Sequence, residues 1–233
     1  MHPELIKHLE SFITDRRREL FLKVLAERTR YITVILEDLY QPHNASAVLR
    51  SCECFGIQDI HIIEKKNTFE VHPDIVLGAS KWLTIHKYPP QEMNTKKTFS
   101  VLKALGYRVV ATVPDPSEVT VDQFNLSKGK IALAFGTELT GLSREAIQSA
   151  DEFLYIPMFG FTESFNISVS AGIILYALTS GIRNNHIRWK LTPEEQEGIY
   201  VQWLQNSIKS SDGIIARWNK KYPGKYDKNH DLL

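Results

Sequence analysis

Short runs of apolar and often β-branched residues alternate with segments of helical periodicity through the middle of the chain. The short runs predict strands, and the longer periodic segments between them predict helices. Gly56 and Gly106 follow two of the periodic segments directly, as expected at helix ends. This alternation predicts an open, mostly parallel α/β sheet. The six predicted strands are residues 32–36, 57–63, 83–86, 107–113, 131–135 and 153–156, and the predicted helices are 44–55, 95–105, 143–150 and 166–180.

Both ends of the chain are predicted to be helical. Residues 4–28 carry apolar side chains at helical spacing, with a break at Thr14-Asp15. Thr192-Pro193-Glu194-Glu195 is a capping-box pattern with proline in the first turn, which predicts the start of a C-terminal helix. We therefore expect an N-terminal helical extension at 1–30, an α/β domain at 31–182 and a C-terminal helical extension at 183–233.

The composition is that of an ordinary globular protein, with 43% hydrophobic and 24% charged residues. Cys52 and Cys54 lack a partner motif, which argues against a disulfide framework or a zinc site. No stretch approaches about 18 consecutive apolar residues, and residues 1–10 lack the apolar run of a signal peptide. We therefore expect a cytoplasmic protein with no membrane partner.

The net charge of +1 conceals an uneven distribution. Basic residues exceed acidic ones by two in residues 1–30 and by three in 183–233, whereas residues 31–182 carry a net charge of −4. Basic ends around an acidic centre suit a polyanion held by the two extensions. On charge alone, two solvated helical tails are the simpler interpretation.

In a parallel sheet, ligands bind beyond the carboxyl ends of the strands. The candidate site therefore lies in the loops that follow Leu36, Val113, Phe135 and Ile156. The chain has no glycine-rich dinucleotide loop, no phosphate-binding P-loop, and none of the H-E-x-x-H, G-x-S-x-G or C-x-x-C motifs. Most of the common enzyme classes are therefore disfavoured.

The first of these loops leads into the segment His43-Asn44-Ala45-Ser46-Ala47-Val48-Leu49-Arg50. Asn44 is expected to cap the following helix, whose buried stripe ends at Cys52 and Phe55. Arg50 lies on the opposite face, whose other residues are small and nearly uncharged: Ser46, Ala47, Ser51 and Cys54. Such a face suits close packing against a partner. A capping asparagine and an ordinary surface arginine would also explain the segment.

Two further loops carry candidate chemistry. Residues 135–143 read Phe-Gly-Thr-Glu-Leu-Thr-Gly-Leu-Ser, in which Gly136 permits a close backbone approach and Glu138 places a carboxylate at the edge of the sheet. Residues 156–170 run from an Ile-Pro strand end through an apolar loop to Ser164 and Asn166, which precede a nearly all-apolar helix. Capping that helix explains one of these two polar residues but not easily both. Small residues in its first turns indicate that another element lies very close.

Together, these three segments resemble the three motifs of the SPOUT superfamily of RNA methyltransferases, in its SpoU/TrmH branch. The first motif is an Asn followed six residues later by Arg, here Asn44 and Arg50; the second is matched throughout 135–143; the third is matched at 156–158 and 164–169. Each motif alone is unspecific, but all three occur in order and the resemblance covers residues 31–182. Phe165 departs from the family pattern, because leucine is usual there.

The resemblance implies a trefoil knot in the C-terminal part of the sheet, S-adenosylmethionine as cofactor, and a homodimer. The helices at 44–55 and 166–180 would be the candidates for the subunit contact. The motif match carries the cofactor contacts to Thr112, Gly136, Ile156, Met158 and Phe165.

The resemblance also implies the reaction, methyl transfer to a ribose 2′-hydroxyl of RNA. Arg50 stands at the position of the activating residue, and because guanidinium stays protonated it would stabilise the developing alkoxide or fix a phosphate. Asn44 and Asn166 would orient the ribose or Arg50, and Ser164 would help to hold the loop. Glu138 would anchor Arg50 or another donor.

The short helical extensions are most similar to those of members that methylate a guanosine ribose in the D-loop of tRNA. The residues expected to hold the tRNA phosphates are Arg16, Arg17, Arg18, Lys220 and Lys221. Two alternatives remain open: a 2′-O-methyltransferase for ribosomal RNA or another tRNA position, and an RNA-binding relative that has lost catalysis.

Overall fold

The computed structural model describes residues 3–70, 72–91, 94–115, 118–137 and 139–222. The chain forms two compact units. The α/β unit is Thr29–Trp189, and the helical unit combines the two ends of the chain, Met1–Arg28 and Lys190–Leu233.

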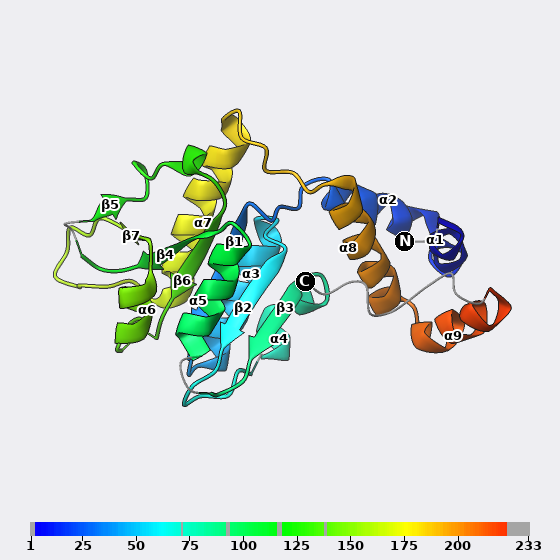
Figure 1. Cartoon of the computed structure of the whole chain (residues 1–233), viewed down its shortest axis with the longest axis horizontal. Coiled ribbons are helices and arrows are strands. Elements are labelled where there is room, and N and C mark those ends of the chain that lie inside the picture. The colour runs from blue at the N-terminus through cyan, green and yellow to red at the C-terminus, as the bar shows by residue number, and fades with distance from the viewer. Residues whose placement is uncertain (1–2, 71, 92–93, 116–117, 138, 223–233) are drawn as a thin grey trace. The chain divides into compact units, whose positions relative to one another are not determined.

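The α/β unit is built on one sheet with the strand order β3-β2-β1-β6-β4-β7-β5 (Figure 1). Every adjacent pair of strands is parallel, so the predicted parallel α/β class is confirmed. The described part of the sheet has seven strands rather than six, because Val119–Thr120 adds a strand too short to give a periodic signal. The strands are β1 (Ile32–Glu37), β2 (Asp59–Ile63), β3 (Thr84–Tyr88), β4 (Arg108–Thr112), β5 (Val119–Thr120), β6 (Ile131–Phe135) and β7 (Glu152–Tyr155).

Helices cover both faces of this sheet (Figure 1). Helices α3 (Pro42–Cys54) and α7 (Ile167–Asn184) pack against each other on one face. Helices α5 (Asn94–Ala104) and α6 (Arg144–Ser149) pack on the other face. Three short elements complete the unit: α4 (Pro73–Val76) and the 3₁₀ helices η1 (Ala79–Lys81) and η2 (Leu126–Lys128).

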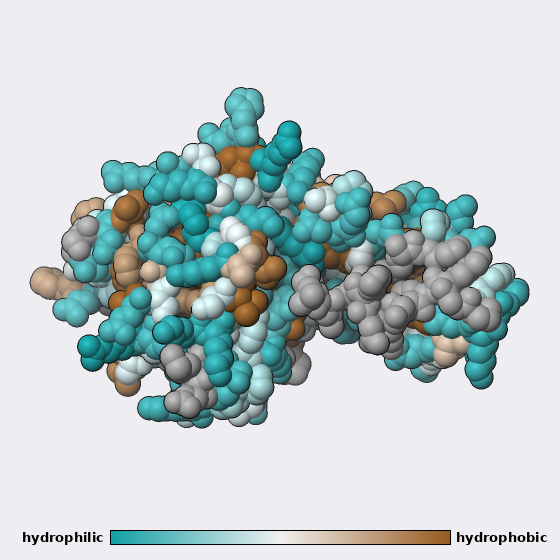
Figure 2. All heavy atoms as spheres, in the orientation of Figure 1, coloured by the Kyte–Doolittle hydropathy of each residue, from teal (hydrophilic) through white to brown (hydrophobic). Residues whose placement is uncertain are grey.

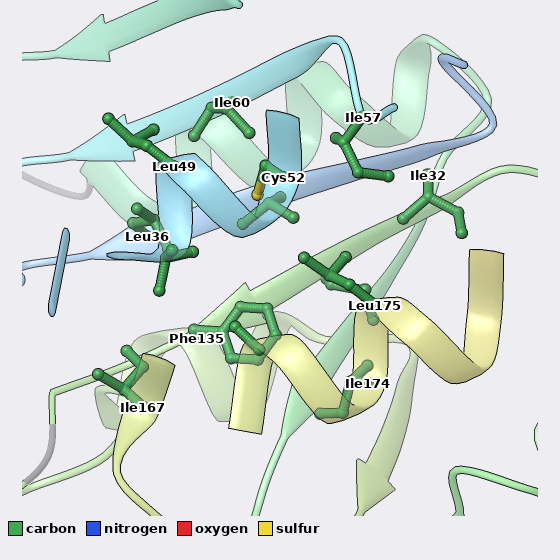
Figure 3. Packing of buried hydrophobic residues seen from close by; sticks show 14 of the residues in the cluster. Ile32, Leu36, Leu49, Cys52, Ile57, Ile60, Phe135, Ile167, Ile174 and Leu175 are labelled. Carbon is green, nitrogen blue, oxygen red and sulfur yellow. The ribbon is translucent and has the colours of Figure 1, made fainter. Parts of the chain in front are cut away.

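The main hydrophobic core lies between the sheet and the α3–α7 pair (Figure 3). Leu36 of β1 and Phe135 of β6 are buried there, together with Leu49 and Cys52 of α3 and Leu175 of α7. The strands β1 and β6 are buried along their whole length because helices cover both of their faces. The sequence of β6 is accordingly a continuous apolar run, and that of β1 is interrupted only by Thr33 and Glu37.

The structure corrects the predicted start of helix α3. The helix begins at Pro42, with Gln41 as its N-cap, so Asn44 is not the capping residue. Proline suits a first helical turn because its missing N–H would be unpaired there in any case. Asn44 instead lies buried inside the first turn. Ser46 is also buried, and its Oγ accepts a hydrogen bond from the His72 N–H at 2.6 Å, so the open face of α3 is narrower than expected.

The helical unit contains α1 (Pro3–Glu10), α2 (Asp15–Leu25), α8 (Pro193–Ser207) and α9 (Ser211–Lys221). The predicted break is present, since Thr14 caps α2 by accepting a hydrogen bond from the Arg17 N–H. The predicted capping box at Thr192 is also confirmed. The core of this unit includes Leu5, Leu9, Phe21, Trp203, Leu204 and Ile214.

Candidate functional site

The loops that carry the three predicted motifs all lie at one edge of the sheet. The loop after β1 leads into α3, the loop after β6 into α6, and the loop after β7 into α7. Strands β1, β6, β4 and β7 are consecutive neighbours in a parallel sheet, so their carboxyl ends share one edge. Residues more than a hundred positions apart are therefore brought to the same side of the molecule.

A hydrogen bond joins the first and third motifs. The Nδ2 of Asn166 donates to the Oδ1 of Asn44 at 3.1 Å, and the Nδ2 of Asn44 donates to the Oε1 of Gln41 at 3.0 Å. The Oδ1 of Asn166 caps α7 by accepting from the Ser168 N–H at 2.9 Å. Asn166 thus uses one end of its amide for the helix and the other for Asn44. This double use explains why an asparagine serves here better than a serine.

Arg50 lies nearly two turns further along α3, with an exposed side chain. It forms no hydrogen bond or ion pair with another residue in the described part of the chain. The structure therefore does not bring Arg50 into contact with Asn44 or Asn166. Its guanidinium stays available to an anionic group, which is the state that an electrostatic role in catalysis requires.

The second motif forms a tight loop between β6 and α6. The Thr137 and Gly141 main chains pair with each other through two hydrogen bonds of 3.0 Å. A Cβ atom on Gly136 would lie 2.2 Å from the carbonyl carbon of Gly141, so the returning chain excludes any side chain at Gly136. Ser143 caps α6, where its Oγ accepts a hydrogen bond from the Ala146 N–H. Glu138 lies outside the described residues.

Sequence reasoning missed a buried carboxylate that holds this loop in place. Glu37, at the carboxyl end of β1, is 2% exposed. Its Oε2 accepts from the Ser143 N–H at 2.8 Å, and its Oε1 accepts from the Ser143 Oγ at 2.7 Å. Thr95 of α5 also donates to Oε1, and the Lys65 Nζ lies 2.9 Å from it. The only signal in the sequence is an acidic residue that directly follows an apolar strand.

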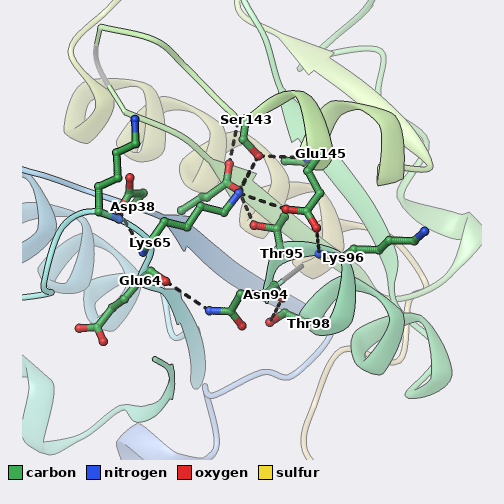
Figure 4. A network of polar contacts seen from close by, with 12 residues as sticks. Asp38, Glu64, Lys65, Asn94, Thr95, Lys96, Thr98, Ser143 and Glu145 are labelled. Carbon is green, nitrogen blue, oxygen red and sulfur yellow. Dashed lines mark hydrogen bonds and ion pairs between the residues drawn. The ribbon is translucent and has the colours of Figure 1, made fainter. Parts of the chain in front are cut away.

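Figure 4 shows how Lys65, Thr95, Ser143 and Glu145 converge from separate parts of the unit. Burial raises the pKa of Glu37, but hydrogen bonds from Thr95, Lys65 and Ser143 outweigh burial and hold the pKa below its ordinary value. Partial burial lowers the pKa of Lys65, but Glu37 and Glu145 more than reverse this and raise it. Glu37 is therefore ionised at neutral pH. Its hydrogen bonds to Ser143 hold the end of the second-motif loop against β1.

The residues predicted to bind the cofactor share this edge of the sheet. The Thr112 Oγ1 donates to the Ala134 carbonyl at 2.9 Å, so its side chain is committed to the sheet. Ile156 and Met158 are half-buried, and Phe165 is exposed. Half-exposed apolar side chains beside the main chain of a tight loop fit a purine ring with polar edges. The residues present thus fit S-adenosylmethionine.

Ser164 is exposed in the loop before α7, and the structure records no hydrogen bond between it and other described residues. The predicted RNA-binding residues lie in the helical unit. Arg16, Arg17 and Arg18 are exposed on α2, where Arg18 lies 3.9 Å from the Glu10 carboxylate. Lys220 and Lys221 are exposed at the end of α9.

Two further findings bear on the class of the protein. Among the described residues, no cluster of three or more His, Cys, Asp or Glu side chains could hold a metal ion. No described helix is long and apolar enough to cross a membrane.

A parallel α/β sheet whose motif-bearing loops gather at its carboxyl edge, with paired asparagines and a nearby arginine, defines an α/β methyltransferase of the SPOUT type. The family model described as "SpoU rRNA Methylase family" matches residues 31–176, and the chain belongs to this family.

Known relatives narrow the comparison. The chain is 40% identical over 202 residues to a tRNA (guanosine(18)-2'-O)-methyltransferase of Borreliella burgdorferi, covering 87% of this chain and 90% of the relative. The crystal structure of the A. aeolicus TrmH/SpoU tRNA modifying enzyme is similar with a TM-score of 0.75 and 27% identity, covering 84% of this chain and 98% of that one. The SpoU methyltransferase AviRb from Streptomyces viridochromogenes, solved with AdoMet, shares the fold at a TM-score of 0.58 and 22% identity, covering 70% of this chain and 65% of that one.

Proposed function

We propose that this protein methylates the ribose 2′-hydroxyl of guanosine 18 in the D-loop of tRNA, with S-adenosylmethionine as methyl donor. The observation that carries the proposal is the Asn44–Asn166 hydrogen bond, which joins two family motifs separated by 122 positions at the carboxyl edge of the sheet. The relative from Borreliella burgdorferi, aligned over most of both chains, supports tRNA as the substrate.

The sulfonium methyl group of S-adenosylmethionine is already activated, so the protein must align the hydroxyl and help it to lose its proton. Arg50 stabilises the negative charge that develops on the ribose oxygen, or fixes the adjacent phosphate. A guanidinium stays protonated in proteins, so Arg50 does not act as the base. Asn44 and Asn166, already hydrogen-bonded to each other, orient the ribose.

Ser164 and Glu138 complete the proposed site. Ser164 is exposed in the third-motif loop, where its hydroxyl is open to a bound ligand, and Glu138 keeps the role that the motif match gives it. The cofactor is held by Gly136, Thr112, Ile156, Met158 and Phe165. Thr112 acts through its main chain, because its hydroxyl is hydrogen-bonded to the Ala134 carbonyl.

We further propose the division at 1–30, 31–182 and 183–233, with the two extensions contacting tRNA phosphates. Arg16, Arg17, Arg18, Lys220 and Lys221 supply the cations. A cytoplasmic location belongs to the same proposal, since it is consistent with a tRNA substrate.

A homodimer and a trefoil knot belong to the same proposal. The outer faces of α3 and α7 are the proposed subunit contact. On α7, Val169 is 46% exposed and Tyr176 is 64% exposed, and apart from the helix's own backbone no described residue lies within 4 Å of a Cβ placed on Gly172. Exposed apolar side chains beside a small residue suit the close approach of a second helix.

The test is the transfer of labelled methyl from S-adenosylmethionine to an unmodified tRNA transcript, with the methylated nucleotide mapped. Wild-type protein is expected to label the guanosine ribose, whereas Arg50→Ala is expected to lose about 100-fold or more in kcat. Arg50→Lys, which keeps the charge, should retain more activity than Arg50→Ala. Lys97→Ala, which removes an exposed cation from α5, is the matched control.

Label on ribosomal RNA or on another tRNA nucleotide would retain the chemistry and reject the substrate. The absence of transfer to any RNA, with S-adenosylmethionine binding intact by calorimetry, would leave an RNA-binding relative without catalysis. Full activity of Arg50→Ala would reject the assigned role of Arg50.

A further inference from the structure

The helical unit contains a cavity that the proposed reaction does not use. It lies between α1 and α9 and has a volume of about 660 Å³. Ligand pockets in proteins commonly measure about 300–1,000 Å³. All of the described residues that line the cavity belong to the helical unit.

Aromatic side chains form part of the wall. Trp218 is 5% exposed, and its ring lies 4.9 Å from that of Tyr222. Phe12 is 49% exposed and meets the ring of His8 edge to face at 5.3 Å. Phe12 thus presents half of its surface to the cavity and solvent, although burial would stabilise it. A flat apolar ligand would cover this ring.

The rim of the same cavity is basic. Lys7, Arg217 and Lys221 line it, and their side chains are exposed. Among the described lining residues, the one carboxylate is that of Glu4. Aromatic faces surrounded by cations match a nucleotide, whose base stacks on the rings and whose phosphate meets the cations.

We propose that this cavity binds one unpaired nucleotide of the RNA substrate. The base stacks on Phe12, and the adjoining phosphates contact Lys7, Arg217 and Lys221, the last of which lies over the Tyr222 ring at 5.4 Å. Glu4 accepts a hydrogen bond from an amino or imino group of the base. The inference rests on the proposed tRNA substrate and adds a second contact point for it, separate from the methyl-transfer site.

The residues predicted from the sequence to bind RNA fall into two groups, according to whether they line this cavity. Lys221 lines the cavity, whereas Lys220, Arg16, Arg17 and Arg18 do not. Lys221 should therefore contribute to a defined subsite, and the others should contribute only to the general attraction of the helical unit for phosphates.

The test is the equilibrium binding of an unmodified tRNA transcript by the full-length protein, measured over a range of salt concentrations without S-adenosylmethionine. Phe12→Ala is expected to weaken binding about tenfold, and Phe12→Trp should restore it, because stacking needs an aromatic face. Arg217→Ala is expected to reduce the slope of log Kd against log salt by about one. Leu20→Ala and Lys23→Ala, which remove an exposed apolar and an exposed basic side chain from α2, are the matched controls.

Methyl-transfer kinetics supply the second readout. The cavity variants should raise the KM for tRNA and leave the kcat and the KM for S-adenosylmethionine within about twofold of wild type. Variants that bind tRNA as tightly as wild type, or no more weakly than the α2 controls, would overturn the subsite. If wild type methylates no tRNA but Phe12→Ala still weakens RNA binding, the proposed substrate fails and the nucleotide subsite stands.

Discussion

Gly136 is the position in the second-motif loop that cannot accept a side chain. A Cβ there would lie 2.2 Å from the Gly141 carbonyl carbon and the Leu142 nitrogen, both main-chain atoms that cannot rotate away. Gly136→Ala is expected to lower the free energy of unfolding by roughly 1–3 kcal/mol through overpacking. It should also lower kcat/KM about 100-fold, because the displaced loop misplaces the cofactor. Urea unfolding and methyl-transfer kinetics measure the two effects.

Gly198→Ala is the control for that substitution, because beyond its own helix none of the described residues lies within 4 Å of the added Cβ. This change should leave activity intact. Wild-type kinetics in Gly136→Ala would show that the loop has another way to accommodate a side chain.

His61 gives the α/β unit a pH dependence. Its ring stacks on His86 at 4.6 Å, and Nδ1 lies 2.9 Å from the Tyr88 hydroxyl. Burial, followed by the charge of His86, lowers the pKa of His61 to about 4, although Asp59 opposes the shift. Between about pH 6.5 and pH 4, His61 is protonated in the unfolded chain but neutral in the folded chain. Stability is therefore complete above pH 6.5 and falls as the pH approaches 4.

The expected loss from His61 is about 2 kcal/mol of unfolding free energy between pH 7.5 and pH 5. Urea titrations at the two pH values measure it. His61→Gln should reduce the difference between them, whereas His186→Gln, which removes an exposed histidine, should not. An equal pH dependence in both variants would contradict the assignment to His61.

At the scale of elements, Glu37 connects β1 to the start of α6 and to α5. Glu37→Gln keeps the shape of the side chain but removes the charge that Lys65 and three hydrogen-bond donors satisfy. We expect it to lower the free energy of unfolding by about 1–3 kcal/mol. The KM for S-adenosylmethionine should rise as the loop ending at Ser143 loosens. RNA binding, measured without the cofactor, should not change.

Glu145→Gln is the control for Glu37→Gln. Glu145 contacts the same Lys65 at 3.3 Å but does not accept from Ser143. Its substitution should therefore affect stability without raising the KM for the cofactor. If Glu37→Gln lowers stability but leaves that KM unchanged, the network supports the fold and does not position the loop.

At the scale of the whole molecule, the proposed homodimer depends on the outer face of α7. Val169→Asp places a charge on a side chain that is 46% exposed, so it should not disturb the fold of one chain. It should weaken dimerisation about 100-fold or more if that face is the interface, because a charge would be buried without a partner. Analytical ultracentrifugation over a concentration series measures the change.

Val101→Asp on α5 is the matched control, because Val101 is 51% exposed on the opposite side of the sheet.

The surface drawn in Figure 2 is mostly hydrophilic, with hydrophobic groups scattered rather than continuous. A wild-type protein that sediments as a monomer would reject the homodimer.

Much of the architecture could be predicted because it depends on local pattern. All six predicted strands are present, the cap predicted at Thr192 forms as expected, and of Ser164 and Asn166 it is Asn166 that caps α7. Each of these strands and caps depends on residues that are close together in the sequence. The start of α3 was predicted two residues too late, since Asn44 has the chemistry of a cap but Pro42 already allows the helix to begin.

By itself, the sequence determined the alternation of strands and helices, the three motifs and their order, and therefore the family. Only the tertiary structure decided that Asn44 binds Asn166, that Glu37 holds Ser143, and that Phe12 and Arg217 share a cavity. The partners in the two hydrogen bonds are 122 and 106 positions apart. Periodicity and capping report interactions between near neighbours along the chain, whereas these contacts form only when strand order and helix packing bring distant residues together.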